Sequence, residues 1–110
     1  MRNKTINAML ELGISANTMG FEYIADAMEL MEKDKELRFH VCRLYDAIAV
    51  KYGAATSSRV ERAIRHAFQS ALTHAPLETT EKWLTNTGKQ TNGSLLSIFY
   101  LRLKGGEADV

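Results

Sequence analysis

The feature that most constrains the fold is a run of apolar residues at helical spacing between positions 58 and 73. Their spacing is i, i+3, i+4, i+7, i+8, i+11 and i+12, and the residues are Val60, Ala63, Ile64, Ala67, Phe68, Ala71 and Leu72. Residues so spaced share one side of a helix, which packs on a core. The opposite side carries basic and amide groups, from Arg59, Arg62, Arg65, His66 and Gln69. We therefore expect an amphipathic helix over about Ser58–Thr73.

The rest of the chain repeats the helical period and contains one proline and few β-branched clusters, which disfavours strands. We expect five more helices, over about Thr5–Leu12, Met19–Glu32, Glu36–Tyr52, Leu77–Thr85, and from Asn92 or Ser94 to just before Gly105-Gly106. The length of 110 residues, 45% of them apolar, fits one compact core. The sequence therefore predicts a single all-α, six-helix domain.

The segment before the amphipathic helix has the features of a helix-turn-helix. Ala49 is small enough for two helices to approach closely, and Gly53 suits the end of a helix. Three hydroxyl residues follow that could cap the next helix, namely Thr56, Ser57 and Ser58. Val60 would then fix the second helix onto the first. Helix-turn-helix folds place that second helix in the major groove of DNA.

The net charge of +1 hides an uneven distribution. Residues 20–37 contain six acidic side chains and two lysines, whereas residues 38–74 contain six basic and two acidic side chains. A basic segment of a nearly neutral protein can still bind a polyanion, because the local field matters more than the total. The acidic segment is either a solvated face or a surface for a basic partner, such as a neighbouring copy or RNA polymerase.

Two strings, IAVKYG followed by SSRVERAIRHAF, resemble the C-terminal effector domain of the stage-zero sporulation response regulator family, the sporulation initiation transcription factors. The similarity continues in GFEYIADAMELM and TNGSLLSIFYLRLK. The resemblance implies a six-helix DNA-binding domain with a helix-turn-helix that regulates transcription during sporulation in the cytoplasm. It also implies binding to double-stranded DNA with TGTCGAA-like elements, often as tandem head-to-tail copies on which the domains self-associate.

Carried over position by position, the resemblance gives base-contacting roles to Glu61, Arg62 and Arg65, and backbone-contacting roles to Ser58 and Arg59. Arginine suits the O6 and N7 acceptors of guanine, and glutamate can accept from cytosine N4. Glu61 also stands four residues before Arg65, so it could simply orient that arginine. His66 lies beside Arg62 on the helical wheel, where it could contact phosphate.

Family members normally carry an N-terminal receiver domain, and 110 residues leave no room for one. We expect either a domain cut from a longer protein or a stand-alone relative. An enzyme is disfavoured because the sequence has no glycine-rich phosphate loop and no nucleophile elbow. We expect no cofactor, no metal site, no membrane span, and a packed rather than reactive Cys42. The alternative function is a protein-interaction module, such as an antagonist that pairs with a full-length regulator without reading DNA.

Overall fold

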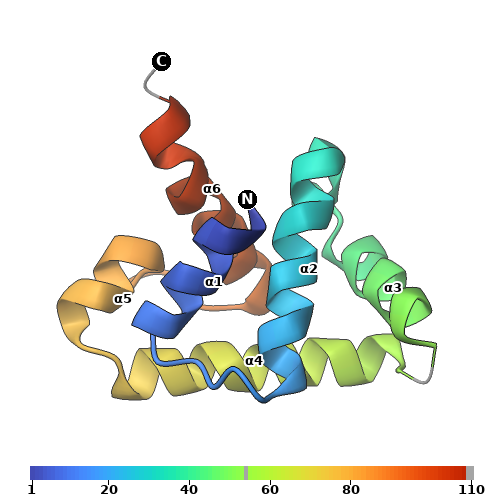
Figure 1. Cartoon of the computed structure of the whole chain (residues 1–110), viewed down its shortest axis with the longest axis horizontal. Coiled ribbons are helices and arrows are strands. Elements are labelled where there is room, and N and C mark those ends of the chain that lie inside the picture. Colours follow the sequence, from blue (N-terminus) through green and yellow to red (C-terminus); the bar gives the residue numbers. More distant parts are fainter. Residues whose placement is uncertain (54, 109–110) are drawn as a thin grey trace.

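The structure is a computed structural model that describes residues 1–53 and 55–108 (Figure 1). Within these residues it contains helices and no strand, which confirms the all-α, six-helix prediction. The helices are α1 (Arg2–Glu11), α2 (Met19–Lys33), α3 (Val41–Tyr52), α4 (Ser57–His74), α5 (Leu77–Trp83) and α6 (Asn92–Ala108), with a 3-10 helix, η1 (Lys35–Phe39), between α2 and α3.

α4 is the longest helix over the described residues and lies across one edge of the molecule, below the other helices in Figure 1. α2 is the central helix and contacts α1, α3, α4 and α6. The core is continuous and includes side chains from each of these helices, among them Met9, Ile24, Ile48, Phe68 and Phe99, all fully buried. One side of α4 thus contributes to the core, and the other side faces away from the rest of the fold.

Two predicted helices differ from the structure. The helix expected over Glu36–Tyr52 is divided at His40, whose backbone is not helical, with φ −135° and ψ 67°. The division follows from Asp34, which caps the short 3-10 helix by accepting a hydrogen bond from the Glu36 amide at 3.1 Å. The last helix was expected to stop before Gly105-Gly106 but continues to Ala108, because glycine weakens a helix without forbidding it.

The first helix begins at Arg2 rather than Thr5, and the reason lies in its tertiary contacts. The Arg2 guanidinium reaches three carboxylates on α2, from Glu22, Asp26 and Glu29. These ion pairs add a turn to α1 that its own apolar period does not indicate. The fifth helix ends at Trp83, two residues before its predicted end.

Candidate nucleic-acid interface

The turn between α3 and α4 forms where it was predicted. α3 ends at Tyr52, and Gly53 adopts φ +68°, a conformation that favours glycine. Of the three hydroxyl residues considered as caps, Thr56 is the N-cap, and its side chain accepts from the Arg59 amide at 3.2 Å. The Ser57 hydroxyl instead donates to the Asp46 carboxylate of α3. Ala54, which belongs to the expected turn, lies outside the described residues.

The inner face of α4 is fixed by close packing. Val60, Ile64 and Phe68 are completely buried, and Ala49 of α3 is 9% exposed, as the helix-turn-helix pattern predicts. α2 approaches even more closely: a Cβ atom added to Gly20 would lie 2.5 Å from the Ala63 carbonyl oxygen. Both α2 and α3 therefore hold α4, so its outer face has a defined orientation.

The outer face of α4 presents most of the predicted site residues to solvent. Ser58, Arg59, Arg62, Arg65 and His66 are all exposed, and Gln69 extends the same face. Within the part of the chain that the structure describes, the side chains of Arg59 and Arg62 have no ion-pair or hydrogen-bond partner. Their guanidinium groups are therefore available to an external anion.

Glu61 and Arg65 behave differently, because they bind each other. Arg65 Nη1 donates to both carboxylate oxygens of Glu61 at 2.9 Å. This is the helical pair considered as an alternative role for Glu61. Arg65 remains 47% exposed and Glu61 34% exposed at the side chain, so the pair stays at the surface.

A residue that sequence reasoning took only as a helix start also belongs to this region. Asn92 is 8% exposed, and its Nδ2 donates to the Glu61 carbonyl oxygen at 2.8 Å and to Glu61 Oε2 at 3.3 Å. Thirty-one positions separate the two residues, and no local spacing in the sequence signals their contact.

A shallow groove runs along the outer side of the α3–α4 pair. The residues that line it come from both helices and are Cys42, Tyr45, Ser57, Ser58, Glu61, Arg62 and Arg65. The expectation that Cys42 is packed is wrong: its thiol is free and exposed, because it lies on the outer side of the first turn of α3. The groove places polar side chains of both helices next to the exposed arginines.

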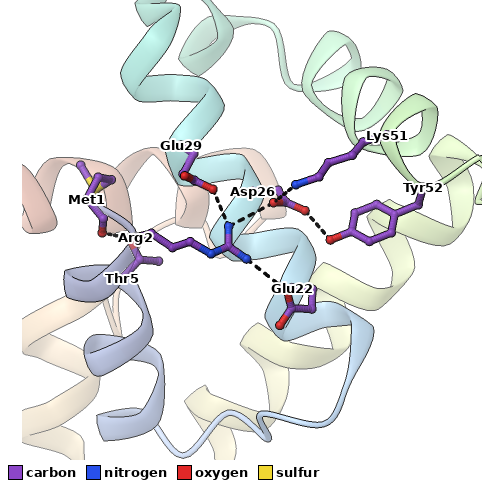
Figure 2. A network of polar contacts seen from close by, with 8 residues as sticks. All are labelled: Met1, Arg2, Thr5, Glu22, Asp26, Glu29, Lys51 and Tyr52. Carbon is purple, nitrogen blue, oxygen red and sulfur yellow. Dashed lines mark hydrogen bonds and ion pairs between the residues drawn. The ribbon is translucent and has the colours of Figure 1, made fainter.

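Figure 2 shows the polar network that anchors α3 just before the turn. The Asp26 carboxylate of α2 is 2% exposed and accepts from Lys51 Nζ at 2.8 Å, from the Tyr52 hydroxyl at 2.6 Å and from Arg2 Nη1 at 3.2 Å. Burial alone would raise the pKa of Asp26, but these hydrogen bonds hold it below the usual value. The pKa of Tyr52 is raised, by burial and by its bond to Asp26.

Other kinds of site have little support among the described residues. No group of three or more histidine, cysteine, aspartate or glutamate side chains within residues 1–53 and 55–105 could hold a metal ion. None of the described helices is long and apolar enough to cross a membrane. The exposed basic face of α4 is the candidate surface for an anionic partner.

One comparison with known proteins bears on this surface. A family model described as "Sporulation initiation factor Spo0A C terminal" matches residues 5–103. The match begins in α1 and ends in α6, so it includes α3, the turn and α4. The resemblance seen in the sequence strings therefore extends over nearly the whole chain.

Proposed function

This chain belongs to the family of sporulation initiation factor Spo0A C-terminal domains, and we propose that it reads specific DNA sequences by placing α4 in the major groove. The family consists of DNA-binding transcription factor domains that regulate sporulation and is not an enzyme family. The proposal concerns what the family alone leaves open, namely which residues read the sequence and which hold the backbone.

The exposed basic face of α4 is the observation that carries the proposal. Arg59, Arg62 and Arg65 lie opposite the buried residues Val60 and Ile64. B-form DNA has a major groove wide enough for one α-helix, and arginine is the commonest side chain to contact guanine there. Because α4 lies at the edge of the fold, a duplex can approach its outer face without displacing another element.

We assign base contacts to Arg62, Arg65 and Glu61. An ionised carboxylate has about four acceptor positions. Arg65 and Asn92 donate three hydrogen bonds to the oxygens of the Glu61 side chain, so one position remains for a cytosine amino group. Ser58, Arg59 and His66 flank these residues and would hold phosphates. In this arrangement the Glu61–Arg65 pair and base contact by Glu61 are compatible.

We further propose that the chain acts as a single effector domain in the cytoplasm, pairs with a second copy on tandem TGTCGAA-like elements, and presents its acidic surface to RNA polymerase. The alternative is an interaction module that retains the fold and pairs with a full-length regulator without reading DNA. The presence of Arg59, Arg62 and Arg65 on the exposed face of α4 argues against that loss, because arginine side chains are the groups that contact phosphates and guanine edges.

The test is a gel-shift titration with a duplex that contains one TGTCGAA-type element and a duplex of the same composition with the element scrambled. Both are measured at one fixed salt concentration, because affinity for DNA falls steeply with salt. We expect clear preference for the element. Equal binding to both duplexes would reject base reading, and no binding to either would favour the interaction module.

A further inference from the structure

The hydrogen bonds around Glu61 form a continuous chain from the core to the surface of α4. Asn92 at the start of α6 donates to Glu61, and Glu61 accepts both bonds from Arg65. Tyr45 of α3 lies beside Asn92; burial raises the pKa of its phenol, and the neighbouring Asn92 amide opposes the rise. The hydrogen bonds therefore connect α4 with the last helix of the fold.

From this geometry we infer that Asn92 is a positioning residue for DNA readout, which holds Glu61 so that Glu61 presents the Arg65 guanidinium to the bases in a fixed orientation. The inference rests on the proposed function, because it specifies how one of the proposed base contacts is organised. Asn92 itself is buried and need not touch DNA.

The contrast with Arg62 shows what the arrangement achieves. Arg62 is exposed and has no partner within the described residues, so it loses side-chain freedom when it binds a base. Arg65 has two bonds to a carboxylate that is itself fixed to buried Asn92, so part of its freedom is lost before DNA arrives. A preorganised side chain binds with a smaller entropic cost and keeps a stricter geometry.

Asn92 is well suited to this role for two reasons. Its amide nitrogen bonds both the backbone carbonyl and the side chain of Glu61, so it fixes the position of the helix turn and the direction of the carboxylate together. It also occupies the first position of α6. Thr91 precedes this helix and accepts hydrogen bonds from the backbone amides of Ser94 and Leu95. Asn92 is thus placed by a separate helix that is packed against α4.

The test compares Asn92→Ala with a matched control, Asn86→Ala, which also loses several amide hydrogen bonds but lies beyond α5 and away from α4. Each variant is titrated with the cognate duplex and with duplexes that carry one changed base pair. The position read by Arg65 is identified as the one at which Arg65→Ala no longer discriminates. At that position we expect Asn92→Ala to lower discrimination by about 3- to 10-fold, and Asn86→Ala to leave it unchanged.

A double-mutant cycle separates positioning from a general structural role. In an Arg65→Ala background, Asn92→Ala should cause no further loss of affinity for the cognate duplex, because the residue through which it acts is gone. An equal loss for all duplexes, or the same loss with and without Arg65, would overturn the inference. If Asn92→Ala folds poorly, Asn92→Asp keeps the side-chain size, suits the start of a helix and repels Glu61, so it should give the same positional loss.

A measurement without DNA keeps the two proposals apart. The side-chain Nε–Hε resonance of Arg65, assigned by its absence in Arg65→Ala, should shift in Asn92→Ala and stay in place in Asn86→Ala. No shift in Asn92→Ala overturns the positioning role whatever the DNA result. If the wild-type protein prefers the cognate duplex, and Arg65→Ala removes this preference but Asn92→Ala does not, only the positioning role of Asn92 is wrong. If wild-type protein shows no preference, the proposed base reading fails.

Discussion

Three arginines on one helix face have three different surroundings, although the sequence presents them as equivalent charges. Arg59 follows the capping turn and lies beside a small depression formed with Met19, Tyr23 and Tyr52. Arg62 has no ion-pair or hydrogen-bond partner among the described side chains, and Arg65 is bound to Glu61. Because the charge of all three is the same, any difference in their contribution to binding must come from geometry.

The first prediction compares Arg62 with Arg59. Changing either residue to alanine removes one positive charge from the same exposed face, so electrostatics alone predicts similar losses. If Arg62 reads a base edge, Arg62→Ala should weaken binding to the specific site by about 1–3 kcal/mol and relax specificity. Arg59→Ala should weaken binding to all duplexes about equally and lower the salt slope by roughly 1.

Binding of both variants to specific and scrambled duplexes at several salt concentrations provides the measurement. Neither variant should lose stability, because both side chains point away from the buried face of Val60 and Ile64. A circular dichroism melt is the control. If Arg62→Ala lowers affinity for both duplexes by the same factor, the base contact is wrong and the helix lies along the backbone.

The exposed face of α4 was predictable because a local period fixes which residues share a helix face, whereas the contact roles proposed for these residues came from the family resemblance. Asn92 could not be found in this way. Its contact with Glu61 depends on how the start of α6 packs against α4, which no spacing within either helix encodes. The exposure of Cys42 was missed for a similar reason, since α3 starts at Val41 and not several residues earlier.

Apolar periodicity predicted where each helix lies along the sequence, but it did not predict where the helices begin and end. The break at His40 depends on the Asp34 cap, and the start of α1 depends on Arg2 reaching the acidic side of α2. Both are contacts that compete with local helix propensity. The turn at Gly53 was predictable because it needs a specific backbone conformation that favours one residue type.

The second prediction tests how tightly α2 holds α4. In Gly20→Ala the new methyl group would lie 2.5 Å from the Ala63 carbonyl oxygen and 3.1 Å from Ala67 Cβ, so the two helices must separate. We expect a loss of about 1–3 kcal/mol in the free energy of unfolding. Because α4 would shift, specific DNA affinity should fall as well.

Gly105→Ala is the matched control for this substitution. Gly105 is also within a helix, but a Cβ atom there meets no other atom within 4 Å. Replacing glycine by alanine in an open helix position should stabilise the protein by about 0.4–1 kcal/mol. Urea unfolding measures both variants. If Gly20→Ala is as stable as Gly105→Ala, the close contact between α2 and α4 is not a constraint on the fold.

At the scale of the whole molecule, carboxylates of α1 and α2 connect the outer helices to the centre. Asp26 joins α1, α2 and α3, as Figure 2 shows. Glu32 of α2 accepts from Lys35, Tyr100 and Lys104, which connects α2 to the 3-10 helix and to α6. Glu11 of α1 accepts from Lys82 and Trp83 of α5. Because each carboxylate connects different helices, its protonation weakens the packing of the helices against one another and not the stability of a single helix.

The third prediction is a loss of stability in acid. Hydrogen bonds from Lys35, Tyr100 and Lys104 lower the pKa of Glu32 from 4.5 to about 2, and the pKa of Asp26 lies below its usual 3.8. A carboxyl whose pKa is lower in the folded state stabilises the fold above its unfolded pKa. That stability is lost as the pH falls through the folded pKa. The urea midpoint should therefore be flat above about pH 5 and fall steadily towards pH 2.

Asp26→Asn tests the contribution of the one buried carboxylate among Asp26, Glu32 and Glu11. The amide keeps the shape but loses the charge that attracts Lys51 and Arg2, so we expect about 1–3 kcal/mol lower stability at pH 7 and a shallower decline in acid. Glu36→Gln is the control, because Glu36 has a side chain 79% exposed and should change stability by less than about 0.5 kcal/mol. An unchanged acid profile in Asp26→Asn would mean that other groups set the pH dependence.

The last prediction concerns self-association. Among the side chains that the structure describes, each large exposed apolar one belongs to a different element, namely Leu10, Met19, Phe39, Val50, Leu77 and Leu101. Such a distribution gives no single helix face from which to build the roughly 1,200 Å² of a stable interface. We therefore expect this 110-residue chain to be a monomer at micromolar concentration in sedimentation.

Two adjacent TGTCGAA-like sites on one duplex raise the local protein concentration enough for weak contacts between the two bound copies to matter. Pairing should therefore appear as cooperative binding to tandem sites, and it should vanish when the sites are moved apart by half a helical turn. A tight dimer without DNA, or cooperativity independent of spacing, would contradict this expectation.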